Sequence, residues 1–106
     1  MDTATEIQQY NIGLLEVNFN TYEALKDGKS IKLSHKEFEV LHYLHQHKQE
    51  CVPRDELINR VWGIDGGITT RTVDNFILRL RQKIESNPND PHIILTVHGV
   101  GYKMIM

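Results

Sequence analysis

The chain has little of several features that mark secreted and membrane proteins. Its single cysteine, Cys51, cannot form an internal disulfide bond, which fits a reducing compartment. No apolar run approaches the roughly 18 residues that a membrane-spanning helix needs, and the N-terminal sequence MDTATEIQQY lacks the basic and apolar segments of a secretory signal. We therefore expect a cytoplasmic protein without a membrane partner.

Internal repeats, low-complexity tracts and room for a second domain are also missing. At 106 residues, with 40% hydrophobic and 25% charged side chains, the chain has the length and composition of one soluble domain with a modest core. We expect residues 10–106 to form this domain. The polar residues 1–9 are expected to be disordered or frayed.

The strong basic excess of many nucleic-acid-binding domains is absent, since the formal net charge is −2. The charges are nevertheless unevenly distributed. Residues 1–53 carry five basic and eight acidic side chains, whereas all five arginines lie between Arg54 and Arg81. Because binding strength depends on how many phosphates are neutralised, a local basic region is sufficient for DNA binding of modest non-specific affinity. Such a module gains from acting in pairs.

What the chain does contain is a segment with two chemically different faces, Thr70–Ile84. Apolar residues recur there at steps of three and four, the pattern of an amphipathic helix, at Val73, Ile77, Leu80 and Ile84. Half a turn away, the same rhythm places guanidinium and amide groups at Arg71, Asn75, Arg79 and Gln82. Their paired donors and acceptors suit phosphates and base edges. The segment therefore predicts a nucleic-acid recognition helix, and we expect Thr70 to cap it.

Upstream of this helix, the sequence predicts a small sheet and a first helix. Short β-rich segments run from Ile12 to Leu33, with Asp27-Gly28 as a strong turn pair, which indicates an antiparallel meander. Ser34 and Glu37 form the pattern of a capping box for a helix that runs to about Lys48.

A second, shorter helix and a terminal hairpin complete the predicted elements. Val52-Pro53 is expected to break the chain, and the helix that follows is expected to end at Gly63. The C-terminal sequence IILTVHGVGYKMIM has two β-rich runs, and we expect Gly99 and Gly101 to form the turn between them. Two helices joined by a turn, followed by a hairpin, are the plan of a winged helix-turn-helix.

At this point the chain, from about Ile12 to Ile105, resembles the C-terminal effector domain of OmpR/PhoB-type response regulators. Four motifs carry the resemblance in the family's order and spacing: LSHKEFEVLHYL, RDELINRVWG, RTVDNFILRLRQKIE and TVHGVGYKM. The resemblance implies an α+β winged helix-turn-helix fold with an N-terminal antiparallel four-stranded sheet, three helices and a C-terminal β-hairpin wing. It also implies sequence-specific DNA binding that controls transcription in a two-component system. The third helix would read the major groove, and the wing would contact the minor groove or the backbone.

The resemblance also assigns candidate DNA-binding residues by position. On the third helix they are Arg71, Asn75, Leu78, Arg79, Arg81 and Gln82, and on the wing they are Thr96, His98 and Gly99. Arg79 suits bidentate pairing with guanine and Asn75 with adenine, each worth roughly 1–3 kcal/mol of discrimination. Leu78 suits a thymine methyl group. Arg81 lies on the flank of the stripe, where phosphates are the expected partners.

A further segment corresponds to the family's loop that touches RNA polymerase or governs activation. It comprises Gly63, Ile64, Asp65, Gly66, Gly67, Ile68 and Thr69. The other implied partners are double-stranded DNA with direct-repeat half-sites, bound as a tandem dimer, a receiver domain and a cognate histidine kinase. The receiver domain that normally precedes this one is absent, so we favour a fragment of a longer regulator over a single-domain protein.

Three departures from the family pattern bear on the interface. Leu78 and His98 stand where relatives often have arginine, which makes both contact surfaces less cationic. Pro53 stands where a serine or threonine usually caps the second helix, which removes a capping bond but is tolerated at a helix start.

Two alternatives remain open on sequence alone. A winged-helix protein-interaction module without DNA binding fits the negative net charge and the Leu78 and His98 departures. A metal-binding protein would use His42, His45 and His47 with Cys51, although their spacing fits no standard zinc pattern. We expect no metal, cofactor or enzymatic activity, since Cys51 is expected in a buried strand and no nucleophile with a partner base can be defined.

Overall fold

The computed structural model describes residues 9–106, apart from the side chain of Asp65. The expected disorder of the N-terminus falls mostly outside these residues, but Gln9 already belongs to the first strand. The strands are β1 (Gln9–Ile12), β2 (Leu15–Asn18), β3 (Glu23–Lys26), β4 (Lys29–Ile31), β5 (Cys51–Pro53), β6 (Ile94–Val97) and β7 (Gly101–Met104). The helices are α1 (His35–Gln46), α2 (Arg54–Leu57), η1 (Ile58–Trp62), η2 (Ile64–Gly66) and α3 (Thr70–Ile84).

The N-terminal sheet is the predicted antiparallel meander, with strand order β1-β2-β3-β4. In the turn between β3 and β4, Lys26 pairs with Lys29 across Asp27 and Gly28. These two turn residues have φ values of 54° and 76°, the left-handed conformation that a two-residue hairpin loop favours. The sequence therefore sets both the turn and the register of β3 against β4.

Helix α1 begins with the predicted capping box. The N–H of Glu37 donates to Ser34 Oγ over 3.1 Å, and the N–H of Ser34 donates to Glu37 Oε1 over 2.8 Å. These bonds satisfy two of the N–H groups that a helix start leaves without partners. The helix ends at Gln46, slightly earlier than predicted.

The second helix is short and changes its winding partway. Pro53 caps it without a side-chain hydrogen bond, as the sequence predicts. Four α-helical residues pass into the π-helical turn η1, in which the N–H of Gly63 donates to the carbonyl of Ile58 over 2.9 Å. Gly63 ends the turn with φ at 89°, a conformation that glycine adopts without strain.

The C-terminal hairpin belongs to a three-stranded sheet, β5-β7-β6. Strand β5 is the strand expected at Cys51, and it includes Val52 and Pro53, which were expected to break the chain. Cys51, expected to be buried in that strand, is exposed. Gly101 is not part of the turn, because it is the first residue of β7 and pairs with both Val97 and Pro53. A Cβ atom at Gly101 would lie 2.0 Å from the carbonyl oxygen of Val52, so this glycine allows the strands to approach.

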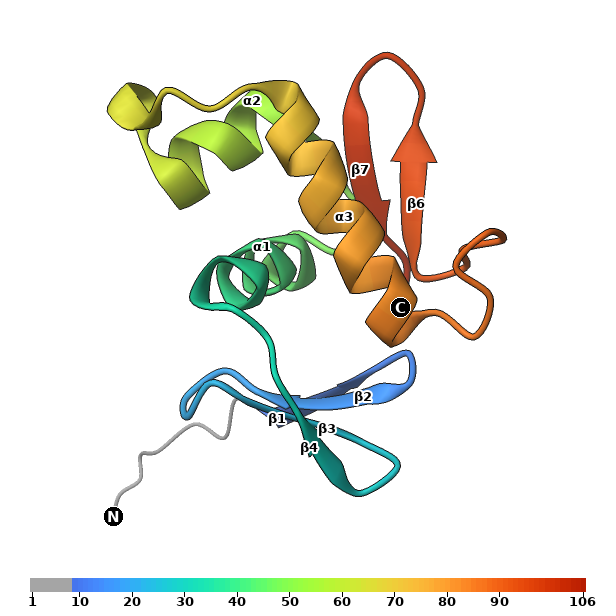
Figure 1. Ribbon diagram of the computed structural model, residues 1–106. Coiled ribbons are helices and arrows are strands. Elements are labelled where there is room, and N and C mark those ends of the chain that lie inside the picture. Colours follow the sequence, from blue (N-terminus) through green and yellow to red (C-terminus); the bar gives the residue numbers. More distant parts are fainter. Residues whose placement is uncertain (1–8) are drawn as a thin grey trace.

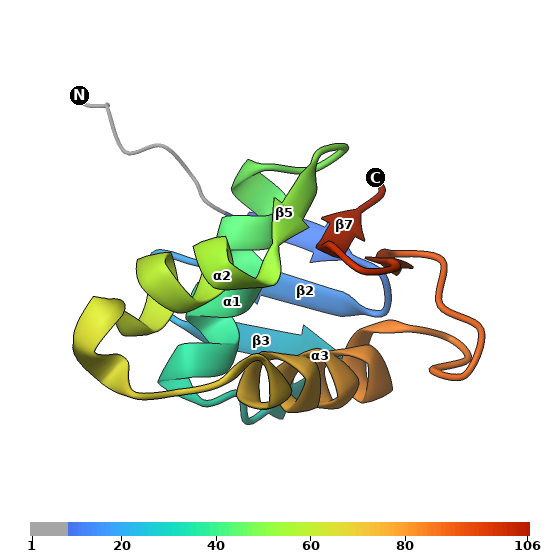
Figure 2. The ribbon, with the colours of Figure 1, turned by 90° about the horizontal axis from the view of Figure 1, so that it is seen from above.

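The N-terminal sheet lies on one side of the helices, as Figures 1 and 2 show from two directions, and the core joins residues of this sheet, the helices and the C-terminal sheet. Its fully buried side chains include Leu15, Leu41 and Ile77, from β2, α1 and α3. The turn between β1 and β2 also reaches the end of α3, where the N–H of Leu14 donates to the carbonyl of Ile84 over 2.9 Å. Gly13 makes this approach possible, because a Cβ atom there would lie 2.4 Å from the same oxygen.

No helix within residues 9–106 is long and apolar enough to cross a membrane.

Candidate nucleic-acid interface

Helix α3 has the predicted bounds and the predicted division into two faces. Its apolar stripe has no solvent exposure at Val73, Ile77, Leu80 and Ile84. Its outward-facing residues, which we call the reading face, are all exposed: Arg71, Asn75, Leu78, Arg79 and Gln82. The cap is Thr69 rather than Thr70, and it makes no side-chain hydrogen bond to the helix. Burial of one stripe thus holds the other outward.

Within the reading face, Arg79 is supported by an aromatic ring. Its guanidinium carbon lies 5.1 Å from the ring centroid of Phe76, three residues earlier on the helix. Phe76 in turn meets Trp62 of η1 edge to face, with 5.1 Å between ring centroids. No role was predicted for Phe76, although its i, i+3 spacing from Arg79 is visible in the sequence.

Arg81, predicted to meet phosphates from the flank, lies half-buried between α3 and β6. Its Nε and Nη2 atoms donate to the carbonyl of Ile94 over 3.0 and 2.8 Å, and Nη2 also donates to Thr96 Oγ1 over 2.9 Å. The guanidinium carbon lies 5.5 Å from the ring centroid of Tyr102. Two candidate DNA-binding residues, Arg81 and Thr96, therefore bind each other, and their phosphate contacts stay a prediction.

Glu85, the residue that follows α3, fixes the start of the hairpin and was missed from sequence. Its side chain is buried, and its carboxylate accepts hydrogen bonds from the N–H groups of His92, Ile93 and Ile94 over 2.8, 2.9 and 2.8 Å. These donors lie seven to nine residues away along an irregular connection. We call the contacts of Arg81 and Glu85 with residues 92–96 the wing junction.

A second polar cluster joins α2, α3 and β7 through Asp74. Its Oδ1 atom accepts hydrogen bonds from Arg54 Nε over 2.8 Å and from the hydroxyl of Tyr102 over 2.5 Å. The guanidinium of Arg54 also lies over the Tyr102 ring, 5.4 Å from its centroid. Burial alone would raise the pKa of Asp74, but the hydrogen bonds from Tyr102 and Arg54 outweigh it and hold this pKa below its ordinary value.

The hairpin forms the wing, which comprises β6, β7 and the tip between them. His98, Gly99 and Val100 at the tip are exposed, as the candidate DNA contacts His98 and Gly99 require. Gly99 has φ at 75°, which confirms its predicted turn role. The N–H of Arg54 donates to the carbonyl of Val100 over 3.2 Å, so the tip is also held to the start of α2. Figure 1 shows the wing beside α3.

The candidate polymerase-contact loop lies at the opposite end of α3 from the wing junction (Figure 1). It contains the short helix η2, and the side chain of Ile64 is 85% exposed. Gly67 ends η2 in the left-handed conformation, with φ at 66°. Gly66 and Thr69 are exposed and Gly63 and Ile68 are half-buried, whereas the side chain of Asp65 lies outside the described part of the molecule.

The histidines considered as metal ligands contact aromatic rings instead. His42 stacks on Phe19 at 4.3 Å between centroids, and His45 lies against Tyr10 at 4.2 Å. Burial lowers the pKa of both histidines. Within residues 9–106, no three or more His, Cys, Asp or Glu side chains gather in a metal-binding arrangement.

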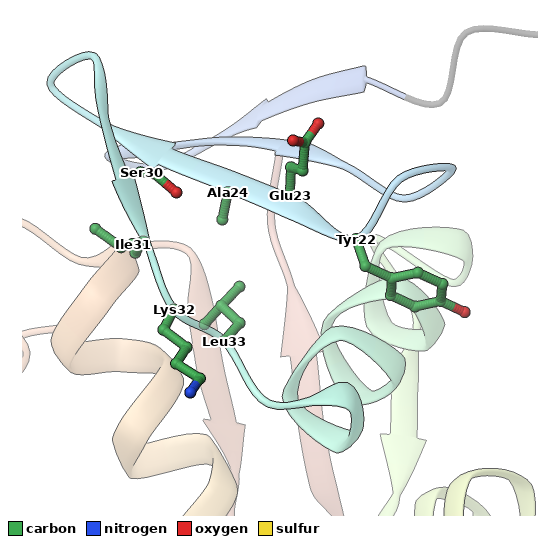
Figure 3. A pocket seen from close by; sticks show the side chains of 7 residues that line it. All are labelled: Tyr22, Glu23, Ala24, Ser30, Ile31, Lys32 and Leu33. Carbon is green, nitrogen blue, oxygen red and sulfur yellow. The ribbon is translucent and has the colours of Figure 1, made fainter.

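A hollow of about 380 Å³ lies over β3 and β4, and no reading-face residue lines it. It is lined by Tyr22, Glu23, Ala24, Ser30, Ile31, Lys32 and Leu33. Figure 3 shows Glu23 and Ala24 pointing to opposite sides of β3, so the lining groups do not converge on one ligand position. The hollow is therefore a weaker candidate site than the exposed face of α3.

The sequence matches the model of the family described as "Transcriptional regulatory protein, C terminal" over residues 28–104. Solved structures agree with this match. The DNA-binding domain of RstA from Klebsiella pneumoniae, solved in complex with the RstA box, is 30% identical, with 92% of this chain and 97% of that chain covered and a TM-score of 0.75. The DNA-binding domain of CssR from Bacillus subtilis is 33% identical, with 85% and 98% covered and a TM-score of 0.72.

A longer relative places the domain within a larger architecture. The response regulator DrrB from Thermotoga maritima, an OmpR/PhoB homologue, is 34% identical over 93% of this chain, with a TM-score of 0.82. The chain spans only 45% of that protein's length. The family match covers most of the chain and includes α1, α2, α3 and the wing. The chain therefore belongs to the C-terminal domains of transcriptional regulatory proteins, and its fold is the winged-helix DNA-binding domain of OmpR/PhoB-type response regulators.

Proposed function

We propose that this domain recognises specific DNA sequences by inserting α3 into the major groove and placing the wing at the adjacent minor groove or backbone. The observation that carries the proposal is the division of α3, with one stripe fully buried and every reading-face residue exposed. An α-helix with such a face fits the width of the major groove. The RstA domain, whose structure was solved on its own DNA box, supports the same use of the fold.

The proposed contacts divide into base reading and positioning. Arg79 and Asn75 would read guanine and adenine through paired hydrogen bonds, and Leu78, which is 55% exposed, would meet a thymine methyl group. Arg71 and Gln82 lie near the two ends of the same face. On the wing, His98 and Gly99 would contact the minor groove or backbone, and Thr96 and Arg81 would add phosphate contacts from the junction.

The proposed assembly is a tandem dimer on direct-repeat half-sites. The net charge of −2 implies weak binding by one copy, and a second copy raises the affinity through effective concentration. In the longer protein we expect a receiver domain and a partner histidine kinase to control this pairing, as the length of DrrB suggests. The exposed Ile64 makes the loop from Gly63 to Thr69 the proposed contact with an RNA polymerase subunit. With this function, we expect the protein in the cytoplasm.

Selection from a random pool of duplexes is the direct test. The 106-residue chain is equilibrated with the pool, and bound duplexes are recovered and sequenced over several rounds. We expect a repeated half-site at about one helical turn's spacing. A pool that stays random would contradict sequence-specific binding.

A second candidate function is favoured by the apolar side chains on the same surface. Leu78 on α3 and Val100 on the wing tip are 55% and 46% exposed, which also suits a protein partner. In that case the fold would serve protein interaction without DNA binding. Titration of a random duplex at about 50 mM salt separates the two, because a DNA-binding domain must show salt-dependent affinity there.

A further inference from the structure

Arg79 differs from the other arginine of the reading face in what its side chain contacts. The guanidinium of Arg79 lies over the ring of Phe76, whereas the side chain of Arg71 makes no hydrogen bond, ion pair or ring contact with any side chain that the structure describes. Both side chains are exposed and carry the same charge. Of these two arginines, only Arg79 is therefore held in place before DNA arrives.

The Phe76 ring is itself held by a chain of contacts that leads to the core. Phe76 is half-buried, and its ring makes a T-shaped contact with the ring of Trp62. The angle between the two ring planes is 75°. Trp62 is partly buried and packs against the hydrophobic core. It is also the last residue of the π-helical turn η1, and turns of this kind occur frequently at functional sites. The support under Arg79 thus crosses from η1 to α3.

We infer that Phe76, held by Trp62, is a positioning residue for base reading by Arg79. A guanidinium over an aromatic face gains a favourable electrostatic contact and loses part of its rotamer freedom in the free protein. Less ordering then remains to be done when the guanidinium meets a base, which strengthens specific binding. This inference rests on the proposed function, because it requires that Arg79 reads a base.

The test is a double-mutant cycle on DNA affinity. Dissociation constants of the chain and its Phe76→Leu, Arg79→Ala and doubly substituted variants are measured on a selected duplex and on a random duplex. Because immobilising one long side chain weakens binding by a few-fold, we expect Phe76→Leu to weaken specific binding about 3- to 10-fold. Binding to the random duplex is expected to change less than about twofold. In the Arg79→Ala background, the Phe76 substitution should have no further effect on specific binding.

Two controls separate positioning from folding. Phe76→Tyr keeps an aromatic face and should restore the affinity of the unchanged chain. Tyr22→Leu removes an aromatic ring that is 50% exposed and touches His35 and Phe38, and it should leave both affinities unchanged. Thermal unfolding of each variant establishes that the compared proteins are folded at the temperature of the binding assay.

A spectroscopic readout follows the contact directly in the DNA-free protein. A ring next to an arginine shifts the NMR signals of the arginine side-chain protons, so Phe76→Leu should move the Arg79 δ-proton signals toward those of Arg71. Unmoved Arg79 signals would overturn the contact. Equal loss on the selected and random duplexes, or losses that add fully to those of Arg79→Ala, would overturn the positioning role. If no duplex can be selected at all, the proposed function fails instead, and the NMR shift still reports on the contact.

Discussion

The reading face and the wing junction use the same residue type in opposite ways. Arg79 and Arg81 are two residues apart on α3, yet Arg79 is exposed over a ring, whereas Arg81 is half-buried and donates to Ile94 and Thr96. The buried stripe of α3 decides this, because a step of two residues turns a side chain by more than half of the helix circumference. An arginine count alone therefore cannot locate a DNA-contacting surface.

The comparison also separates adaptable recognition from fixed geometry. Apart from Arg79, whose guanidinium lies over the Phe76 ring, the exposed side chains of the reading face can adjust to a base. The position of the wing relative to α3 is instead set by hydrogen bonds to backbone groups of residues 92–94. Such bonds fix one register, since a shifted strand would leave buried donors unpaired. These hydrogen bonds thus hold the wing at a defined position beside α3.

The largest expected effect comes from removing the carboxylate of the wing junction. Glu85→Ala leaves the N–H groups of His92, Ile93 and Ile94 without their acceptor, and we expect the free energy of unfolding to fall by about 3 kcal/mol, measured by urea denaturation. Glu85→Gln retains one acceptor oxygen, so its free energy of unfolding should fall by less than that of Glu85→Ala. Surface substitutions usually change the free energy of unfolding by less than about 0.5 kcal/mol. A decrease of that size for Glu85→Ala would mean that the wing junction contributes no more to stability than the reading face.

On the reading face, Arg79→Ala should change recognition without changing stability. Loss of one bidentate base contact is worth roughly 1–3 kcal/mol, so binding to a selected duplex should weaken by about tenfold or more. The free energy of unfolding should stay within about 0.5 kcal/mol of its original value, because the side chain is exposed. Fluorescence anisotropy on the selected duplex and on a random duplex checks this. Equal losses on both would argue against base reading.

Arg81→Ala should produce a smaller and mixed effect. Because the carbonyl of Ile94 and the hydroxyl of Thr96 lose their donor, we expect unfolding to become easier by about 1 kcal/mol. Affinity for selected and random duplexes should fall together. If Arg81 also meets a phosphate, the slope of binding affinity against salt concentration should become shallower by about one unit. An unchanged slope with lower stability would assign Arg81 to the junction alone.

The smallest expected effect concerns pH and Asp74. Its pKa is lowered in the folded protein, so its contribution to stability is fully present above the ordinary aspartate pKa and is lost as the pH falls through the lowered folded value. The Asp74 side chain is 39% exposed, and solvent screening keeps the contribution modest. Asp74→Asn should therefore reduce stability slightly at neutral pH, and its difference from the unchanged chain should narrow in acid. A difference that is constant with pH would exclude a charge-dependent contribution.

Periodic and local features of the fold could be predicted from the sequence, but distant polar contacts could not. The bounds of α3 follow from apolar residues that recur in every turn of the helix. The Ser34–Glu37 capping box involves only residues close in sequence. A strand was expected at Cys51, but its pairing with β7, about fifty residues later, could not be predicted, because three residues alone do not specify a partner strand. The position of Gly101 in β7 is hidden for the same reason.

The candidate site was predicted in the same uneven way. Helical spacing identified the reading face correctly as an exposed stripe, because it depends on α3 alone. The inward role of Arg81 and the acceptor role of Glu85 depend on the path of residues 86–93, which no periodicity describes. The support of Arg79 by Phe76 was within reach of the i, i+3 rule, but the role of Trp62 required the π-helical turn.

The close approach of Gly13 to Ile84 has a practical consequence for domain engineering. The β1–β2 turn packs directly against the last residue of α3, because the Ile84 backbone occupies the space that a methyl group at Gly13 would need. A shortened protein that kept only the helices and the wing would lose this contact, and it would also lose the N-terminal sheet that covers the core. To transfer DNA specificity between related domains, one should therefore exchange only the reading-face side chains of α3. The final turn of α3 and the N-terminal sheet that it contacts should come from the same protein.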